Sequence, residues 1–139
     1  MSATAENPPA AGAATATVAP AAPAAPVELR ARARVITDDP LYRTVPALLR
    51  FSPDEPLAVR VVFPADLSPE GTDNEWVFPR ALLEAGLLTP TGTGDVRVWP
   101  CGRVQAIVEF HSPEGVAVVQ FDIAVLRRFL RRTYACATR

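Results

Sequence analysis

The sequence contains no lysine, a single histidine and two cysteines, and each shortage excludes a class of chemistry. Cys101 and Cys136 form no CxxC motif, and His111 has no second His or Cys at a metal-ligand spacing, so no zinc site is expected. His111 shares the end of a predicted strand with Glu109, which is typical of a lightly paired surface side chain. The glycine-rich stretch Thr91–Gly94 lacks the third glycine and the following helix that a phosphate-binding loop needs. Because no nucleophile, base or metal set is in place, we predict a protein that is not an enzyme and has no cofactor.

Long hydrophobic runs are absent as well. No stretch approaches the roughly 18 apolar residues that a membrane span requires. The first 26 residues contain 12 alanines and five prolines but no aromatic residue, and such a composition buries too little apolar area to fold. Their prolines also interrupt the apolar run that a secretory signal would need. We therefore predict a disordered Ala/Pro-rich arm over residues 1–26 and a single domain over residues 27–139, in a cytoplasmic protein with reduced thiols.

The charge is almost balanced in total but unevenly distributed along the chain. The formal net charge is -1. Residues 27–122 carry nine arginines and 14 acids, a net of -5, whereas residues 123–139 carry five arginines and no acid, a net of +5. A near-neutral total disfavours a general nucleic-acid binder, which would carry a clear basic excess. The sequence therefore predicts an acidic body and a basic end.

Hydrophobic periodicity and turn residues predict the secondary structure. Strands are expected at 27–36, 46–51 (entering after a proline), 57–63, 75–78, 95–99, 103–111 and 115–121. A short helix is expected over 80–85 with Gly86 as a left-handed cap, and Thr91–Gly94 is expected to turn the chain into a second round. Asp122 is placed to cap a final helix. This order, four strands and a helix and then three strands and a helix, predicts an α+β domain built on antiparallel sheet.

The final helix is amphipathic. Its apolar residues fall on one arc and four arginines fill the opposite arc, namely Arg127, Arg128, Arg131 and Arg132. One interpretation is a basic surface for an anionic lipid, a nucleic-acid phosphate or an acidic protein. The other is a terminal helix that packs on the sheet, with solvated arginines that favour its own C-terminal dipole. The sequence leaves both interpretations open.

Two further groups are candidates for recognition. Arg30, Arg32 and Arg34 alternate along the first strand and would form a phosphate-binding patch if Arg60 and Arg103 lay on the same face. The alternative is an ordinary charged sheet face. Two tryptophans, Trp76 and Trp99, lie beside turns and suit either the core or an interface, where tryptophan is enriched.

Two tryptophan-containing blocks carry a family resemblance. The blocks Glu75–Phe78 and Thr91–Pro100, separated by Arg80, Leu82-Leu83 and Gly86-Leu87, closely resemble the SsgA-like proteins, which regulate sporulation and cell division in actinomycetes. Asp39-Pro40, the strand at 57–63, Ser112–Gly115 and Phe129–Thr133 follow in matching order. The resemblance spans about residues 27–134.

The resemblance implies a fold like that of the whirly and guide-RNA-binding proteins, assembled as a bell-shaped homotrimer. It also implies a non-enzymatic role, because one member recruits the tubulin-like GTPase FtsZ to future septa and others direct cell-wall enzymes. The resemblance transfers no catalytic residue to this chain.

We therefore expect a cytoplasmic adaptor at division septa, with FtsZ and SsgA-like paralogues as partners and at most peripheral membrane contact. The alternatives are a scaffold for peptidoglycan synthases or hydrolases and a single-stranded nucleic-acid-binding protein, the latter disfavoured by the acidic body. The candidate protein-interaction residues are Arg30, Arg32, Arg34, Trp76, Arg80, Trp99, Arg127, Arg128, Arg131 and Arg132.

Overall fold

The computed structural model describes residues 25–36, 43–64 and 74–137, which form eight strands and two helices. The predicted arm at 1–26 lies outside these residues except for its last two positions. The first half of the chain forms β1 (Val27–Ile36), β2 (Arg43–Phe51), β3 (Ala58–Phe63), β4 (Asn74–Pro79) and helix α1 (Arg80–Gly86). The second half forms β5 (Thr91–Thr93), β6 (Val96–Cys101), β7 (Gln105–Ser112), β8 (Gly115–Asp122) and helix α2 (Ile123–Ala137).

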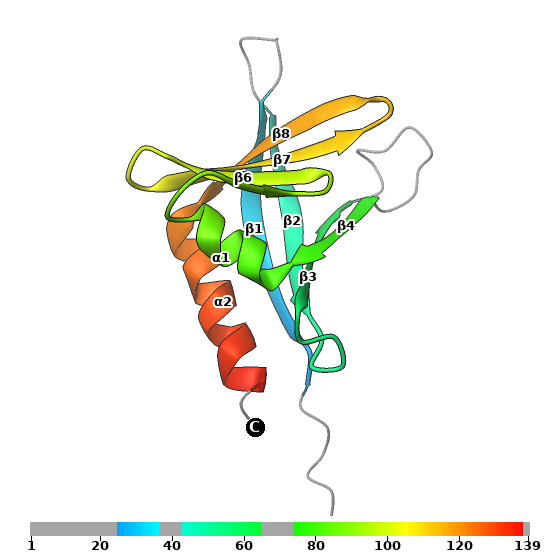
Figure 1. The fold of residues 1–139 in the computed structure, drawn as a ribbon, viewed down its shortest axis with the longest axis vertical. Coiled ribbons are helices and arrows are strands. Elements are labelled where there is room, and N and C mark those ends of the chain that lie inside the picture. The colour runs from blue at the N-terminus through cyan, green and yellow to red at the C-terminus, as the bar shows by residue number, and fades with distance from the viewer. Residues whose placement is uncertain (1–24, 37–42, 65–73, 138–139) are drawn as a thin grey trace, which may run out of the picture.

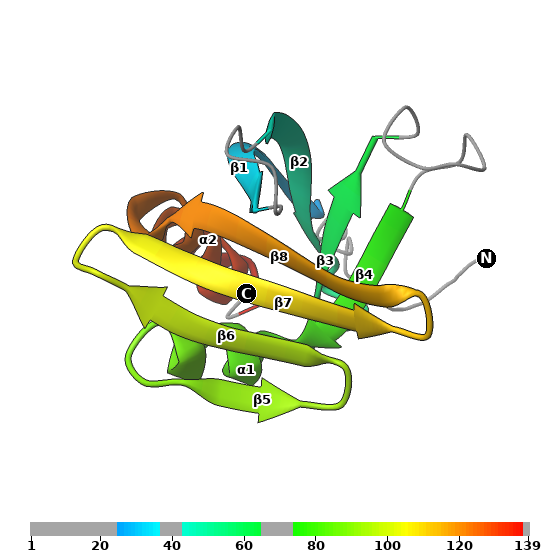
Figure 2. The same ribbon diagram turned by 90° about the horizontal axis from the view of Figure 1, so that it is seen from above.

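All eight strands belong to one antiparallel sheet in the order β4-β3-β2-β1-β8-β7-β6-β5. The sheet has two four-stranded halves, β1–β4 and β5–β8, which meet where β1 pairs with β8 (Figures 1 and 2). Only three residue pairs join β1 to β8, against nine between β1 and β2. The prediction of an α+β domain on antiparallel sheet is confirmed, whereas the likeness to whirly proteins stays a prediction.

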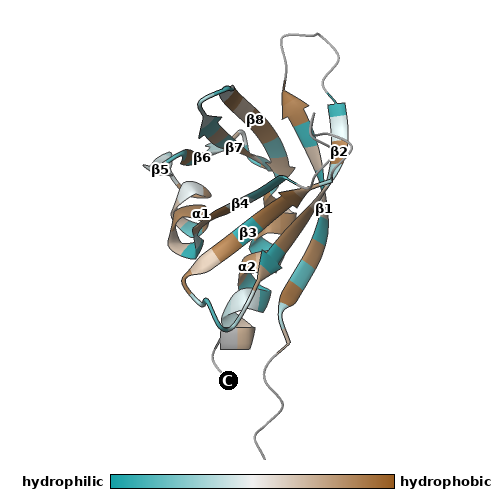
Figure 3. Ribbon diagram, turned by 90° about the vertical axis from the view of Figure 1, so that its right-hand side faces the viewer, coloured by the Kyte–Doolittle hydropathy of each residue, from teal (hydrophilic) through white to brown (hydrophobic). Residues whose placement is uncertain are grey.

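The alternation in β1 sets the inner and outer faces of the first half-sheet. Ala31 and Ala33 are buried while Arg30 and Arg32 are exposed, and the two kinds of residue alternate along β1 in Figure 3. A single cluster of buried apolar side chains draws on both half-sheets and both helices. The period-two pattern therefore places the core on one face of the sheet.

An aromatic cluster joins the two half-sheets. The ring of Phe110 on β7 lies 4.9 Å from that of Trp76, 5.9 Å from that of Phe63 and 6.3 Å from that of Phe78, measured between centroids. Phe110 is 1% exposed. We call these four residues the aromatic junction; since few backbone pairs link the halves, this packing carries much of their connection.

Helix α1 packs on β5 and β6, and α2 packs on β1 and β8. The prediction of Gly86 as a left-handed cap is wrong. Gly86 is the last residue of α1, and the helix ends at Leu87 in the right-handed region (φ -74°). A Cβ atom on Gly86 would lie 2.3 Å from the Cβ of Val98 on β6, so this glycine allows close helix–sheet contact.

Two strand predictions also need correction. Thr91–Thr93 is not a turn but strand β5, which pairs with Val96–Val98, so the second round has four strands and not three. Within the stretch Thr91–Gly94, only Gly94 has the positive φ of a turn, at 59°. The second strand begins at Arg43 and contains Pro46 in its interior. β2 pairs with β3 only from Leu48 on, so β2 lacks that neighbour at Pro46, where a residue without an N–H is tolerated.

Candidate protein-interaction surfaces

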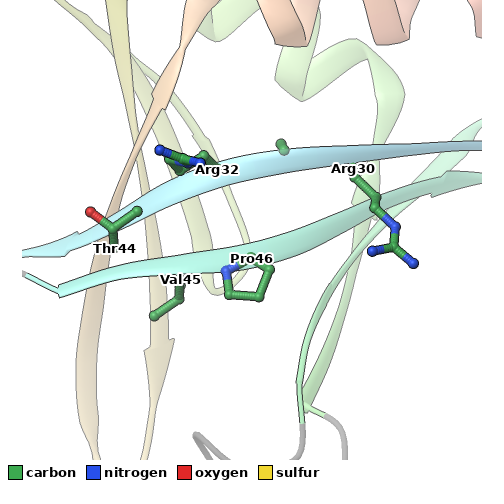
Figure 4. Close-up of a pocket in the computed structure, with 6 residues that line it drawn as sticks. Arg30, Arg32, Thr44, Val45 and Pro46 are labelled. Carbon is green, nitrogen blue, oxygen red and sulfur yellow. The ribbon is translucent and has the colours of Figure 1, made fainter.

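The three arginines of β1 lie on the outer face of the first half-sheet. Arg30 and Arg32 are exposed and line a shallow hollow of about 430 Å³ together with Thr44 and Pro46 of β2. Their guanidinium groups point away from each other in Figure 4. Arg34 is half-buried and donates from Nη1 to Oε1 of Gln120 at 3.5 Å. The row therefore exposes two separate charges, not one convergent site.

The larger arginine patch that would bind phosphate does not form. The guanidinium of Arg60 is held by the carboxylates of Glu55 and Glu75, at 2.5 Å and 3.5 Å. The hydrogen bond that Arg60 donates to Glu55 raises the pKa of Arg60 above its ordinary value. Arg103 lies in the connection between β6 and β7, not on a strand beside β1. Since the outer face mixes both signs of charge, it gives no continuous phosphate track.

Trp76 and Arg80 are held within the domain. Trp76 is half-buried in the aromatic junction and lines a cavity of about 200 Å³ between the half-sheets. The guanidinium carbon of Arg80 lies 3.8 Å from the ring centre of Tyr134 and 5.3 Å from that of Phe51. Arg80 also donates from Nη1 to Oγ1 of Thr133 at 3.4 Å. Arg80 therefore joins the start of α1 to the end of α2 through cation–π contacts and a hydrogen bond.

Trp99 lies on the outer face of the second half-sheet. It is half-buried and lines a groove of about 630 Å³ beside Gly92 and Arg97. Glu109 also lines this groove, and its Oε1 lies 2.9 Å from Nε2 of His111, as the strand spacing predicts. Trp99 therefore presents part of its ring to the outer surface, while Trp76, also half-buried, packs against the core.

Helix α2 separates its four arginines into two pairs. All four are exposed, but only Arg127 and Arg131 line a groove of about 640 Å³ between α1 and α2, whereas Arg128 and Arg132 do not. The dipole explanation for these arginines is wrong, because the last turn of the helix contains no basic residue. Among the described residues, no carboxylate lies within ion-pair distance of Arg127 or Arg131.

The remaining lining of this α1–α2 groove comes from residues that the sequence did not single out. They are Glu84, Leu87, Leu88, Leu130 and Tyr134. Tyr134 donates its hydroxyl to Oε1 of Glu84 at 2.5 Å, and this hydrogen bond, together with desolvation, raises the pKa of Tyr134. The one available signal was the i, i+4, i+7 spacing of Arg127, Arg131 and Tyr134, which puts all three on one side of a helix.

The described residues contain no metal-like cluster. No three His, Cys, Asp or Glu side chains in this part of the chain converge on a point that would hold an ion. Cys101 and Cys136 are both free thiols. Neither described helix is long and apolar enough to span a bilayer.

Comparisons with known proteins agree with this architecture. Residues 45–139 match the family model described as the Streptomyces sporulation and cell division protein SsgA. The sporulation-specific cell division protein SsgB of Salinispora tropica is 40% identical over 116 residues, which is 81% of this chain and 80% of that protein. The SsgB protein of Streptomyces coelicolor is 43% identical over 111 residues, covering 78% of this chain and 77% of that one.

Two solved structures share the fold. The structure of SsgB, from work relating its mutations to longitudinal cell division in Streptomyces coelicolor, superposes with a TM-score of 0.71 at 35% identity, covering 83% of this chain and 91% of that one. An SsgA-like sporulation-specific cell division protein from Thermobifida fusca superposes with a TM-score of 0.72 at 31% identity, covering 83% and 84%. The fold and the match together define a sporulation and cell-division protein family. The chain belongs to this SsgA family.

Proposed function

We propose that the protein is a non-enzymatic adaptor of sporulation-specific cell division that helps to position the FtsZ ring at septum sites. The observation that carries the proposal is the 40% identity to a sporulation-specific cell division protein along four-fifths of both chains. The proposed active form is a homotrimer in the cytoplasm at the septum. Such a form presents three copies of each surface and gains avidity toward a polymer.

The surfaces of the described domain support an adaptor role. The grooves beside Trp99 and between α1 and α2 are open hollows of about 630 and 640 Å³, and each combines apolar with charged side chains. Tryptophan, tyrosine and arginine are the side chains that most often anchor protein interfaces. Opposed charges such as the acidic body and the basic helix govern encounter more than final affinity.

The paired charges of the first half-sheet weigh against nucleic acid as the partner. Arg50 and Arg60 are engaged by Glu28, Glu55 and Glu75, so phosphates would have to compete with carboxylates already in place. Nucleic-acid affinity that depends on phosphate contacts falls steeply with salt. A mobility-shift series across salt should therefore show no binding even at low salt.

Replacement of the Streptomyces coelicolor relative tests the role in division. The chain is expressed in a strain that lacks its own SsgB, and sporulation septa are counted with fluorescent FtsZ. We expect regular FtsZ ladders and septa to return. Hyphae that stay without septa, although the protein is present at normal amounts, would contradict the proposal.

Co-sedimentation with purified FtsZ polymers tests direct recruitment. We expect the protein to pellet with FtsZ at physiological salt. The amount that pellets with FtsZ is compared between R30E/R32E, which reverses the two exposed charges of β1, and R43E/R103E, which makes the same change in charge elsewhere. If septation is restored without FtsZ binding, crosslinking in sporulating cells then identifies a peptidoglycan synthase or hydrolase as the partner instead.

A further inference from the structure

Two leucines are left unusually open to solvent. Leu57 is 79% exposed and Leu88 is 73% exposed, the two highest values among the large hydrophobic side chains of the described residues. Single exposed apolar residues are common on soluble proteins, so exposure alone assigns nothing. Their surroundings differ in sign of charge. Leu88 lies at the arginine-lined α1–α2 groove, whereas Leu57 follows two acids, Asp54 and Glu55.

The α1–α2 groove has an apolar floor and a basic wall. Leu87 and Leu130 are each 6% exposed and form the floor of the groove, while Leu88, which also lines it, is exposed to solvent. Arg127 and Arg131 lie one helical turn apart and have no carboxylate partner in the described part of the chain. The one acid in the lining, Glu84, accepts the hydroxyl of Tyr134. A projecting apolar side chain next to a negative charge therefore matches the groove.

The groove is already ordered in the single chain. Two contacts join α1 to α2. The guanidinium of Arg80 stacks on the ring of Tyr134, and the hydroxyl of Tyr134 donates a hydrogen bond to Glu84. The close approach of Gly86 to Val98 fixes α1 on the sheet. Since these contacts exist before any partner arrives, binding loses little conformational entropy.

The loop between β2 and β3 carries the matching features. Two successive turns shape it, with hydrogen bonds from the N–H of Glu55 to the carbonyl of Ser52 at 3.0 Å and from Ala58 to Glu55 at 3.1 Å. Pro53 and Pro56 occupy the second position of each turn, where the fixed φ of proline is favourable.

At the surface of this 52–58 loop, one acid is available for a partner. The carboxylate of Glu55 binds Arg60, whereas no described arginine lies within ion-pair distance of Asp54. Leu57 follows three residues later with its side chain 79% exposed, and its carbonyl accepts a hydrogen bond from the N–H of Arg80 at 2.8 Å. In Figure 1 the loop extends from the lower end of β3, apart from α2.

We propose that the 52–58 loop of one copy docks into the α1–α2 groove of a second copy, with Leu57 beside Leu88 and Asp54 facing Arg127 and Arg131. The contact pairs two different patches, so its repetition from copy to copy gives a ring where the rotation between copies closes and a filament where it does not, and two copies that exchange it form a dimer. The inference specifies the contact behind the homotrimer in the proposed function and does not depend on FtsZ binding. A recessed floor accepts a projecting side chain and does not fit a flat lipid surface.

Mass measurements across concentration test the contact. Light scattering and sedimentation are run on the wild type, L57S and R131E, with R132E and V104S as matched controls. Arg132 is exposed on the same helix but does not line the groove, and Val104 is a 67% exposed residue of another loop. We expect L57S and R131E each to weaken association about tenfold or more, and the controls to leave it unchanged within about twofold.

The charge swap D54R/R131E is the decisive variant. D54R alone and R131E alone should each weaken association, and their combination should recover at least part of it, because the pair is restored in reverse. A monomeric wild type at concentrations up to about 100 μM, equal losses in R131E and R132E, or a double variant weaker than both singles would each overturn the proposal. Circular dichroism confirms that each variant is folded. FtsZ binding is scored separately, so its failure leaves the mass result interpretable.

Discussion

The aromatic junction and the α1–α2 groove both join parts of the chain that are distant in sequence, but the junction is more deeply buried, although Trp76 is half-buried there and lines a cavity of about 200 Å³. At the junction Phe110 is 1% exposed and Phe78 is 4% exposed. At the groove Leu88 is 73% exposed, and two arginines of α2 have no described carboxylate partner. Apolar surface that is buried within the chain stabilises the folded state. Apolar surface that stays exposed can instead be buried against another molecule. The first region therefore stabilises the domain, and the second is available for association.

The largest effect is expected from truncation at the junction. F110A removes the ring that contacts Phe63, Trp76 and Phe78, and should lower the free energy of unfolding by about 3–5 kcal/mol. Urea unfolding followed by Trp76 fluorescence in a W99F background measures the loss. F110L serves as the milder variant if F110A does not fold. If F110A lowers the free energy of unfolding by less than a substitution at an exposed position such as V104S, the junction does not stabilise the domain.

The helix–sheet contact at Gly86 should be the next most sensitive. A methyl group there would meet the Cβ of Val98 at 2.3 Å and its carbonyl oxygen at 2.9 Å, so the backbone must move. G86A is expected to lower the free energy of unfolding, measured by thermal denaturation, by about 1–3 kcal/mol. It should also weaken self-association, because α1 forms one side of the groove. G94A is the comparison variant, because an added Cβ on Gly94 meets no atom within 4 Å but its φ of 59° is strained for an L residue, so its loss reports backbone strain without a steric clash.

The hydrogen bond between Tyr134 and Glu84 should have a smaller, pH-dependent effect. Y134F should lose about 0.5–1 kcal/mol of stability, a modest value because Tyr134 is partly exposed. The pKa of Tyr134 is raised in the folded state, so the contribution is fully present below the ordinary value near 10 and is lost as pH rises through the folded pKa.

Absorbance titration of tyrosinate checks this assignment. In a Y42F background, Tyr134 should ionise above about pH 10, and E84Q should shift the midpoint back toward 10. An unchanged midpoint in E84Q would show that Glu84 is not the cause of the raised pKa.

The smallest effect is expected at the exposed ion pair between Arg50 and Glu28. Both side chains are close to half exposed and their charged atoms lie 3.1 Å apart. R50Q should cost at most about 1 kcal/mol, and the difference should shrink further in high salt because exposed charges are screened. A loss of stability comparable to that of F110L would contradict the view that ion pairs on the outer face contribute little to the stability of the fold.

The sequence allowed most elements to be predicted, but not the groove. The alternation of β1 and the amphipathic pattern of α2 extend over many residues and survive in the structure. The three-residue strand β5 contains a glycine and gives too short a pattern, and Gly86 matches a helix cap locally although a tertiary contact determines its use.

The groove escaped prediction for a different reason. Its lining comes from residues 84–88 and 127–134, which meet only after both helices pack on the sheet. Leu88 follows the end of α1, where no helical period marks its direction. The four arginines of α2 look equivalent in the sequence, and only the position of α1 distinguishes Arg127 and Arg131 from their neighbours.

A single pair of measurements on L88S tests most directly whether the groove serves association and not folding. Mass is measured across concentration, and unfolding is measured at high dilution, where association no longer adds to stability. We predict a clear loss of the oligomer together with an unfolding free energy within about 0.5 kcal/mol of the wild type. An unchanged oligomer in a destabilised chain would contradict this conclusion and would assign Leu88 to the fold.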